Sequence, residues 1–171
     1  MPKKKEEVRK FGGITIDVDP FRAISEGDIR LLKFCLEQDG FEINSCKWSG
    51  WTLLHRAAEL GRDDIIALLV DNGADPNIYS SWGWQTPLHM ALGRGHLDAA
   101  VTLVDRGADQ FKKNKYKQNA ATLANSRGLG AVVKEFKAEV IRREILRYKA
   151  TIEKSKEDFK KKVHETSKSK T

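Results

Sequence analysis

The sequence has 171 residues, of which 40% are hydrophobic and 32% charged, and its net charge is +7. This length is enough for one domain with its own core and short for two. Only two cysteines are present and no run of about 20 apolar residues occurs, which argues against a disulfide framework and against a membrane span.

Residues 1–18 are predicted to form a basic, largely extended arm. Residues 1–10 hold five basic and two acidic side chains and lack the apolar core of a secretion signal, so we expect an intracellular protein in the cytoplasm, with the nucleus as the alternative. Within residues 14–18 three apolar side chains alternate, Ile14, Ile16 and Val18. This alternation predicts an extended strand that lies along the first helical unit or on a partner.

Charge is distributed unevenly along the chain. Residues 11–111 hold eight basic and fifteen acidic side chains, whereas residues 112–171 hold eighteen basic and seven acidic ones. An acidic body between basic ends indicates an anionic partner for the ends, and solubility alone is the alternative explanation.

Residues 51–79 and 85–113 are two copies of one pattern. Their matching residues lie 34 apart: Thr52 and Thr86, Leu54 and Leu88, His55 and His89, Gly61 and Gly95, Gly73 and Gly107. Self-similarity at this period is typical of stacked supersecondary units. Apolar residues at helical spacing, stopped twice by glycine, predict a helix, a turn, a second helix and a loop in each copy.

These copies resemble ankyrin repeats. TPLHMALGRGHLDAAVTLVDRGAD follows the pattern of that family nearly throughout, and TLLHRAAELGRDDIIALLVDNGADPN departs from it at Leu53, where the family has proline. Weaker copies flank them, DPFRAISEGDIRLLKFCLEQDGFEIN before and NAATLANSRGLGAVVKEF after. The resemblance implies an all-α ankyrin-repeat solenoid of helix-turn-helix units with projecting hairpin loops. Its expected extent is 19–137, in repeats at about 19–46, 47–80, 81–113 and 114–137.

Two histidines in the repeats, His55 and His89, are the obvious candidates for catalysis or metal binding. In the family such a histidine pairs with its threonine at the start of the first helix, and no cluster of ligating residues surrounds either one. Phosphate-binding and hydrolase motifs do not occur. The sequence therefore predicts a protein that is not an enzyme and that uses no metal or cofactor.

Asparagines that end a repeat raise the possibility of a modification. In the family, such an asparagine with a leucine eight residues before it can be a hydroxylation target. Asn77 with Leu69 and Asn44 with Leu36 have this form, and the alternative is that both are ordinary turn residues.

The resemblance places the segments before each threonine at the tips of projecting fingers. These segments read KWSGWT, SWGWQT and NKYKQN. Trp48 and Trp82 lie four residues before their threonines, and Tyr116 lies near the equivalent place. Turns do not favour tryptophan, whereas binding interfaces use it as an anchor, so we expect an exposed aromatic row that a partner covers. The alternative is that the rings pack on each other or on the tails.

Further partner contacts are expected near the fingers and in the concave groove. The predicted contact residues besides the aromatic row are Ser49, Trp51, Glu59, Leu60, Gln85 and Arg94, and Gly93 is expected to face the same groove. Trp84 stands where the preceding finger has Gly50. We therefore expect Trp84 and Gly83 to have exchanged places.

Residues 138–171 are predicted to form a basic helical extension with a frayed end. No glycine or proline follows Gly130, and one apolar stripe has 3,4 spacing, as in a coiled coil. Its predicted interface residues are Ile141, Ile145, Tyr148, Ile152 and Phe159. A partner helix or an external surface would cover this stripe, and docking on the chain's own repeats is the alternative.

Together these features predict a non-catalytic scaffold or adaptor. Its fingers and groove bind a protein, and its basic helix anchors it to a larger assembly, for which an acidic surface such as that of tubulin, in the cytoskeleton or a cilium, is suitable. The alternative is a nucleic-acid-associated accessory protein that uses its basic tails.

Overall fold

The computed structural model describes residues 9–11, 14–16, 19–46 and 50–168. It divides the chain into two compact units, Met1–Val133 and Lys134–Thr171. Within the described ranges the structure is helical apart from one short hairpin, so the predicted all-helical repeat fold is confirmed.

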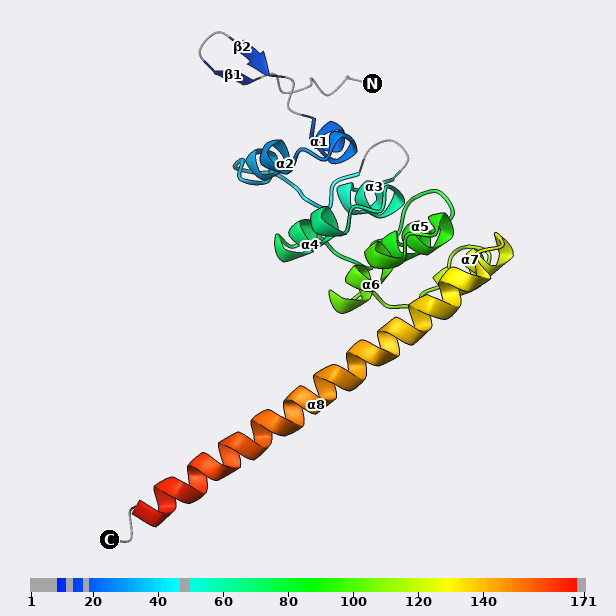
Figure 1. Ribbon diagram of the computed structural model, residues 1–171. Coiled ribbons are helices and arrows are strands. Elements are labelled where there is room, and N and C mark those ends of the chain that lie inside the picture. Colours follow the sequence, from blue (N-terminus) through cyan, green and yellow to red (C-terminus); the bar gives the residue numbers. More distant parts are fainter. Residues whose placement is uncertain (1–8, 12–13, 17–18, 47–49, 169–171) are drawn as a thin grey trace. The chain divides into compact units, whose positions relative to one another are not determined.

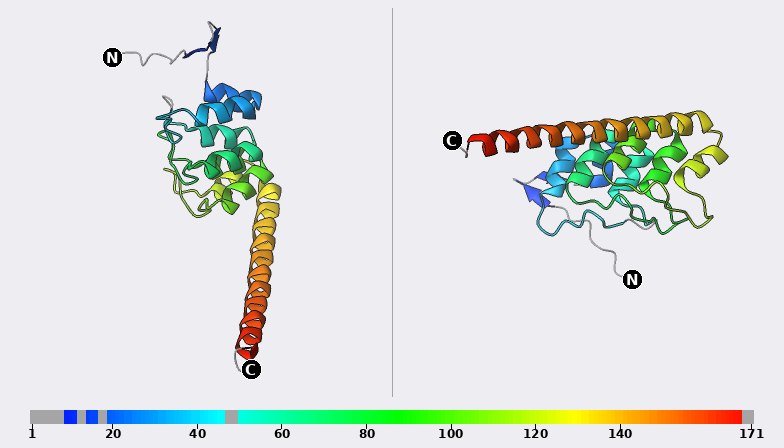
Figure 2. Two further views of the ribbon diagram at one scale, coloured as in Figure 1. Left: turned by 90° about the vertical axis from the view of Figure 1, so that its left-hand side faces the viewer. Right: turned by 90° about the horizontal axis from the view of Figure 1, so that it is seen from below.

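Helix pairs succeed one another through the first unit. They are α1 (Pro20–Glu26) with α2 (Ile29–Leu36), α3 (Leu53–Glu59) with α4 (Asp63–Asp71), and α5 (Pro87–Arg94) with α6 (Leu97–Asp105). Helix α7 (Ala120–Ser126) follows and packs against α5. Because α1 also packs on α3, α3 on α5, and α4 on α6, the pairs form two parallel rows of helices (Figure 1). The loops that join one pair to the next gather on one side of these rows (Figure 2).

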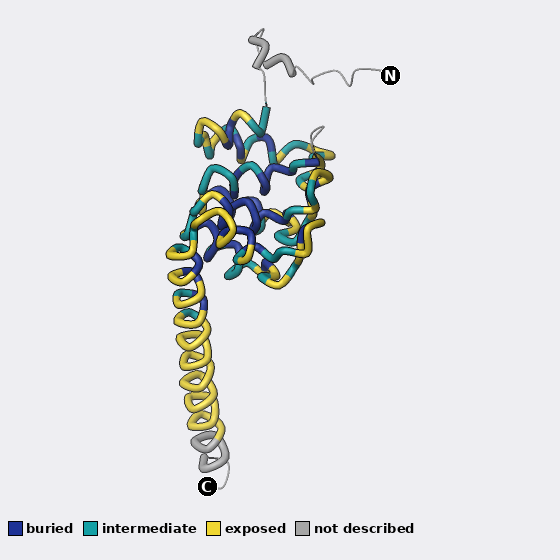
Figure 3. Tube along the Cα trace, turned by 90° about the vertical axis from the view of Figure 1, so that its right-hand side faces the viewer, coloured by how far each residue is buried: buried dark blue, intermediate teal, exposed yellow. Residues whose placement is uncertain are grey.

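Small and aliphatic side chains make the core between the inner helices. Leu54 and Ala57 of α3 and Leu88 and Ala91 of α5 are all at most 1% exposed. Alanine at the contact lets neighbouring helices approach closely, while the leucines fill the space between them. The dark segments of Figure 3 show this core running through the stacked helices.

Gly61, between α3 and α4, shows how the repeats are held at close spacing. Its φ of +68° lies in the left-handed region that side chains rarely adopt. A Cβ there would also lie 2.7 Å from the imidazole of His96, which belongs to the next repeat. The imidazole Nε2 is bonded to the Glu59 carbonyl at 3.0 Å, so glycine gives room for a hydrogen bond between repeats.

Ahead of α1, β1 (Arg9–Phe11) pairs antiparallel with β2 (Ile14–Ile16). The predicted strand therefore exists at Ile14–Ile16, and it pairs with a segment that was not predicted; its placement along the first repeat or on a partner stays a prediction. Its hydrogen bonds are made to the segment just before it in the chain, with Arg9 opposite Ile16, and Val18 lies outside the described residues.

The long C-terminal helix is confirmed as α8 (Gly130–Lys168), which is unbroken over 39 residues (Figure 2). Phe136 and Val140 near its start are 1% and 6% exposed. From Ile141 to Lys162 almost every side chain is exposed, as the light-coloured part of the helix in Figure 3 shows.

Candidate functional site

The two finger tips that the structure describes in full, before α5 and before α7, are closed by backbone and side-chain hydrogen bonds. In the finger before α5, the Ser80 amide donates to the Gln85 carbonyl at 2.9 Å, and the Ser80 hydroxyl accepts from the Gln85 amide at 3.2 Å. Asn114 takes the place of Ser80 in the next finger and caps it in the same way, because its carboxamide oxygen accepts from the Tyr116 and Gln118 amides. These hydrogen bonds hold the loops in shape, although the loops belong to no helix or sheet.

The aromatic side chains at the finger tips are open to solvent. Trp82 is 74% exposed, Trp84 61% and Tyr116 66%. Trp48 and Ser49 lie outside the described residues, so the aromatic row can be followed over two of its three fingers. The rings of Trp82 and Tyr116 are thus not enclosed by other parts of the described chain, which was the alternative to an exposed row.

Trp84 adopts a backbone conformation that is unfavourable for tryptophan. Its φ is +51°, and the corresponding residues of the neighbouring fingers, Gly50 and Lys117, have φ of +67° and +59°. Gly83 also has a positive φ of +81°, so the expected exchange of places was wrong: Trp84 itself takes the glycine conformation. The left-handed region costs a residue with a side chain roughly 1–2 kcal/mol.

A groove of about 490 Å³ lies between the fingers and the inner helices. Its lining residues are Trp51, Trp82, Gln85, Met90, Gly93, Arg94 and Arg127. The structure brings together four of the predicted contact residues, Trp51, Trp82, Gln85 and Arg94, together with the expected Gly93. Its lining mixes three apolar side chains, Trp51, Trp82 and Met90, with three polar or charged ones, Gln85, Arg94 and Arg127, as a protein-binding surface with aromatic and arginine contacts does.

The other predicted contact residues that the structure describes, Tyr116, Leu60 and Glu59, do not line this groove. Tyr116 is exposed on the next finger, and Leu60 is half-buried at the end of α3. Glu59 has a largely buried carboxylate, 13% exposed, which binds two arginines of the chain itself.

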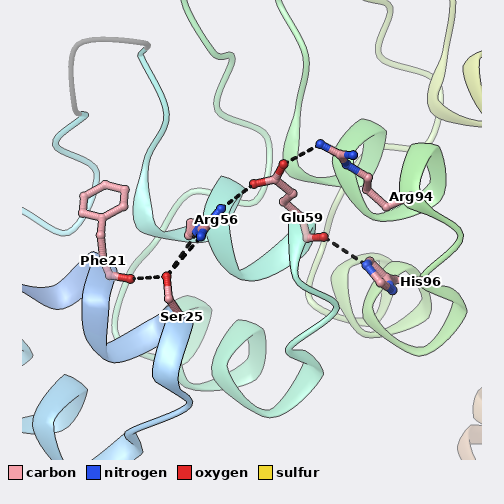
Figure 4. A network of polar contacts seen from close by, with 6 residues as sticks. All are labelled: Phe21, Ser25, Arg56, Glu59, Arg94 and His96. Carbon is pink, nitrogen blue, oxygen red and sulfur yellow. Dashed lines mark hydrogen bonds and ion pairs between the residues drawn. The ribbon is translucent and has the colours of Figure 1, made fainter.

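Figure 4 shows this carboxylate between its two partners. The Arg56 guanidinium donates to Glu59 Oε2 at 2.9 Å from within α3, and the Arg94 guanidinium donates to Oε1 at 2.6 Å from α5. Arg56 also donates to the Ser25 hydroxyl of the preceding repeat at 3.2 Å. Glu59 therefore positions Arg94 across a repeat boundary, and its role in the structure is orientation of the groove wall.

Met90 and Arg127 line the groove and were not predicted. Arg127 directly follows α7, and it is separated from Arg94 by the same interval that separates Gly128 from Gly95. Continuing the repeat register by one more unit would have found it. Met90 could not be found in this way, because its repeat equivalent Arg56 faces the ion-pair network instead.

The repeat histidines are buried and serve as helix caps. His55 Nε2 bonds to the Gln85 carbonyl at 2.9 Å, and since a carbonyl only accepts, this nitrogen carries the proton. His55 Nδ1 is then an acceptor for the Thr52 amide at 3.3 Å. His89 repeats the arrangement with Thr86 and Gln118. Burial lowers the pKa of both imidazoles, which keeps them neutral.

Two turn asparagines join one repeat to the next. The Asn77 carboxamide accepts from the Asp109 amide at 2.7 Å and donates to the Gly107 carbonyl at 2.9 Å. Asn44 makes the same pair of bonds to Asp75 and Gly73. Both side chains are therefore used in stacking, and their hydroxylation stays a prediction.

Helix α8 exposes the predicted stripe along its length. Its five side chains are exposed to different degrees: Ile141 56%, Ile145 50%, Tyr148 70%, Ile152 36% and Phe159 70%. Leu146, which lies beside the stripe, is 56% exposed as well. These residues are placed on a solvated helix surface, and their use as an interface stays a prediction.

The described residues also bear on metal binding and on membrane insertion. They contain no group of three histidine, cysteine or acidic residues that could hold a metal ion. None of their helices is long and apolar enough to cross a membrane.

Comparison with known proteins agrees with the repeat structure. A family model described as ankyrin repeats in many copies matches residues 21–59 and 54–104. A mouse 2-5A-dependent ribonuclease is 41% identical over 63 residues, which cover 36% of this chain and 8% of that protein. Protein phosphatase 1 regulatory subunit 12A of mouse and of rat is 36% identical over 66 residues, or 39% of this chain and 6% of those proteins. The matched segment thus spans less than a tenth of the length of these relatives.

Proposed function

Because the chain belongs to the ankyrin repeat family, we propose that it is a non-catalytic adaptor that binds a protein through its fingers and groove. Ankyrin repeats are protein-interaction modules, and the family is generally non-catalytic. The observation that carries the proposal is Trp82, which is 74% exposed at a finger tip and also lines the groove. An indole in that position can bury most of its surface only when another molecule covers it.

The basic helix supports a second contact in the same proposal. Residues 112–171 hold eleven more basic than acidic side chains, and α8 combines this charge with an exposed apolar stripe. In our proposal α8 anchors the adaptor to a larger assembly with an acidic surface, such as a microtubule of the cytoskeleton or a cilium, and the protein acts in the cytoplasm.

Affinity purification of the tagged full chain from cells tests the adaptor role. We expect protein partners that remain after nuclease treatment and that Trp82→Ala loses, with binding weakened about tenfold or more. Phe111→Ala is the matched control, because Phe111 is 73% exposed on a loop and does not line the groove. Both variants should keep the circular dichroism spectrum of the parent chain.

Two results would contradict the adaptor role. Unchanged partner recovery with Trp82→Ala would place the interface elsewhere. Loss of all partners on nuclease treatment would instead favour the nucleic-acid-associated alternative, for which the excess of basic side chains in residues 112–171 is the supporting observation.

A further inference from the structure

Two arginines occupy equivalent positions in successive repeats. Arg94 ends α5, and Arg127 caps the end of α7 one repeat later. Each reaches back to the last turn of the inner helix one repeat earlier. Arg94 binds Glu59 there at 2.6 Å, and Arg127 donates to the Gly93 carbonyl at 2.9 Å.

The carboxylate that neutralises Arg94 has no counterpart at Arg127. In the repeat register, Gly93 takes the place that Glu59 has one repeat earlier. A Cβ at Gly93 would lie 2.6 Å from a guanidinium nitrogen of Arg127, so the missing side chain lets the cation lie across the helix. Among the described residues, the bond to the Gly93 carbonyl is the one polar contact of this guanidinium. Within the described part of the chain, Arg127 therefore carries a charge without a carboxylate partner.

The surroundings of Arg127 favour an acidic occupant with an apolar neighbour. Of the two charged residues that line the groove, Arg94 is neutralised by Glu59, so the positive charge of the groove comes from Arg127, and Trp51, Trp82 and Met90 supply apolar wall. This local positive charge contrasts with residues 11–111 as a whole, which have seven more acidic than basic side chains. A planar guanidinium with free N–H groups matches the two oxygens of a carboxylate.

We infer that Arg127 is the binding position for a carboxylate of the partner, which replaces the missing side chain at Gly93 and pairs as Glu59 does with Arg94. The partner segment is an acidic peptide in which an aspartate or glutamate lies next to an aromatic or aliphatic side chain. That apolar side chain packs against Trp82. This inference rests on the proposed function and assigns the chemistry of the same groove.

The experiment uses a phage-displayed library of random peptides as the probe for the full chain. Peptides selected by the parent chain should be enriched in an acidic residue beside an apolar one. For the best peptide, replacing its acidic residue by the amide should weaken binding by about tenfold, which is the effect expected for a charge-assisted pair at a partly exposed site.

Two variants remove the unpaired positive charge of Arg127 in different ways. R127Q deletes it, and G93E supplies the carboxylate from within the chain, so that Arg127 is already paired. The change to glutamate is compatible with the helix, since only the flexible end of the Arg127 side chain must shift. In both variants the acidic and amide peptides should bind almost equally. R142Q removes an exposed arginine of α8 and should keep the tenfold preference.

The outcomes distinguish failure of this inference from failure of the proposed function. If R127Q and G93E keep the tenfold preference while W82A loses the peptides, Arg127 is not the carboxylate position and the groove still binds protein. If the parent chain selects no peptides, this inference fails, and the affinity purification still decides the proposed function. If W82A keeps every selected peptide, the peptides do not bind at Trp82, and the proposed role of the groove fails as well.

Discussion

At the scale of single residues, the buried histidine caps make stability depend on pH. Both imidazoles accept a hydrogen bond at Nδ1 and donate one at Nε2, which requires the neutral form. Burial lowers the pKa of His55 and His89 below the ordinary value of 6.5, so near and below that pH the unfolded chain binds more protons than the folded one. The stabilising contribution is present above pH 6.5 and is lost as the pH falls.

We therefore expect the free energy of unfolding, measured with urea, to decrease between about pH 6.5 and pH 5.5, before most carboxylates titrate. His89→Gln should be less stable at neutral pH, because the Thr86 amide and the Gln118 carbonyl lose well-placed partners, at about 1–3 kcal/mol each. The stability of this variant should also depend less on pH, because one of the two buried imidazoles is gone. A parent chain with equal stability at both pH values would contradict the assignment of neutral, capping histidines.

A second residue-scale prediction concerns Trp84. Trp84→Ala and Trp84→Gly both remove the exposed ring, but only glycine relieves the strain of a φ of +51°. The glycine variant should therefore have the larger free energy of unfolding in urea, by about 1 kcal/mol. Trp82→Ala and Trp82→Gly form the matched pair, since Trp82 is not among the residues with positive φ, and there glycine should give no advantage. Equal stability of the two Trp84 variants would show that the loop relaxes.

At the scale of elements, the start of α8 is buried, whereas the apolar stripe on its later turns is exposed. Val140 is 6% exposed, whereas Ile145 and Tyr148, on the following turns, are 50% and 70% exposed. Side chains this open contribute little to folding, so Ile145→Asp should change the free energy of unfolding by no more than about 0.5 kcal/mol. Phe136→Ala, at a residue 1% exposed, should cost about 3–5 kcal/mol in the same assay.

Light scattering on the parent chain and on Ile145→Asp should accompany this experiment, because the result is interpreted differently for a monomer and for a dimer. If Ile145→Asp lowers the stability of a monomer by about 2 kcal/mol or more, as loss of a buried side chain does, the stripe is covered by the chain itself in solution, which is the docking alternative. A parent dimer that Ile145→Asp dissociates would identify a second copy as the occupant of the stripe.

At the scale of the whole molecule, periodicity determined how much could be predicted. The resemblance to ankyrin repeats placed Trp82 on a finger and Trp51, Gln85 and Arg94 in the concave groove, and the structure brings these four residues to one groove. The strand at residues 14–16 was also predictable, but its pairing with residues 9–11 was not. Alternation of apolar side chains identifies a strand but does not show which strand pairs with it.

The close approach of Arg127 to Gly93 could not be predicted in this way. Gly93 reads in the sequence as one more helical residue, and its importance lies in the 2.6 Å approach of a guanidinium from the next repeat. Such an approach depends on the distance between stacked helices, which no residue pattern gives. Likewise, the ion pairing of Glu59 excluded it from the groove lining although its repeat position was correctly predicted to lie near the end of the first helix.

In stacked repeats, the extent of the region that a core mutation destabilises should depend on the position of the mutation in the stack. Leu32 of α2 and Leu92 of α5 are both 0% exposed, so replacing either with alanine leaves a cavity worth about 2–5 kcal/mol. Helix α5 packs against α3, α6 and α7, whereas α1 and α2 pack on each other and, through α1, on α3. Because each repeat is stabilised by its neighbours, Leu92→Ala should reduce hydrogen-exchange protection throughout α3–α7. Leu32→Ala should reduce it mainly within residues 20–36. Equal loss of protection along the whole stack in both variants would mean that the repeats unfold as one cooperative unit.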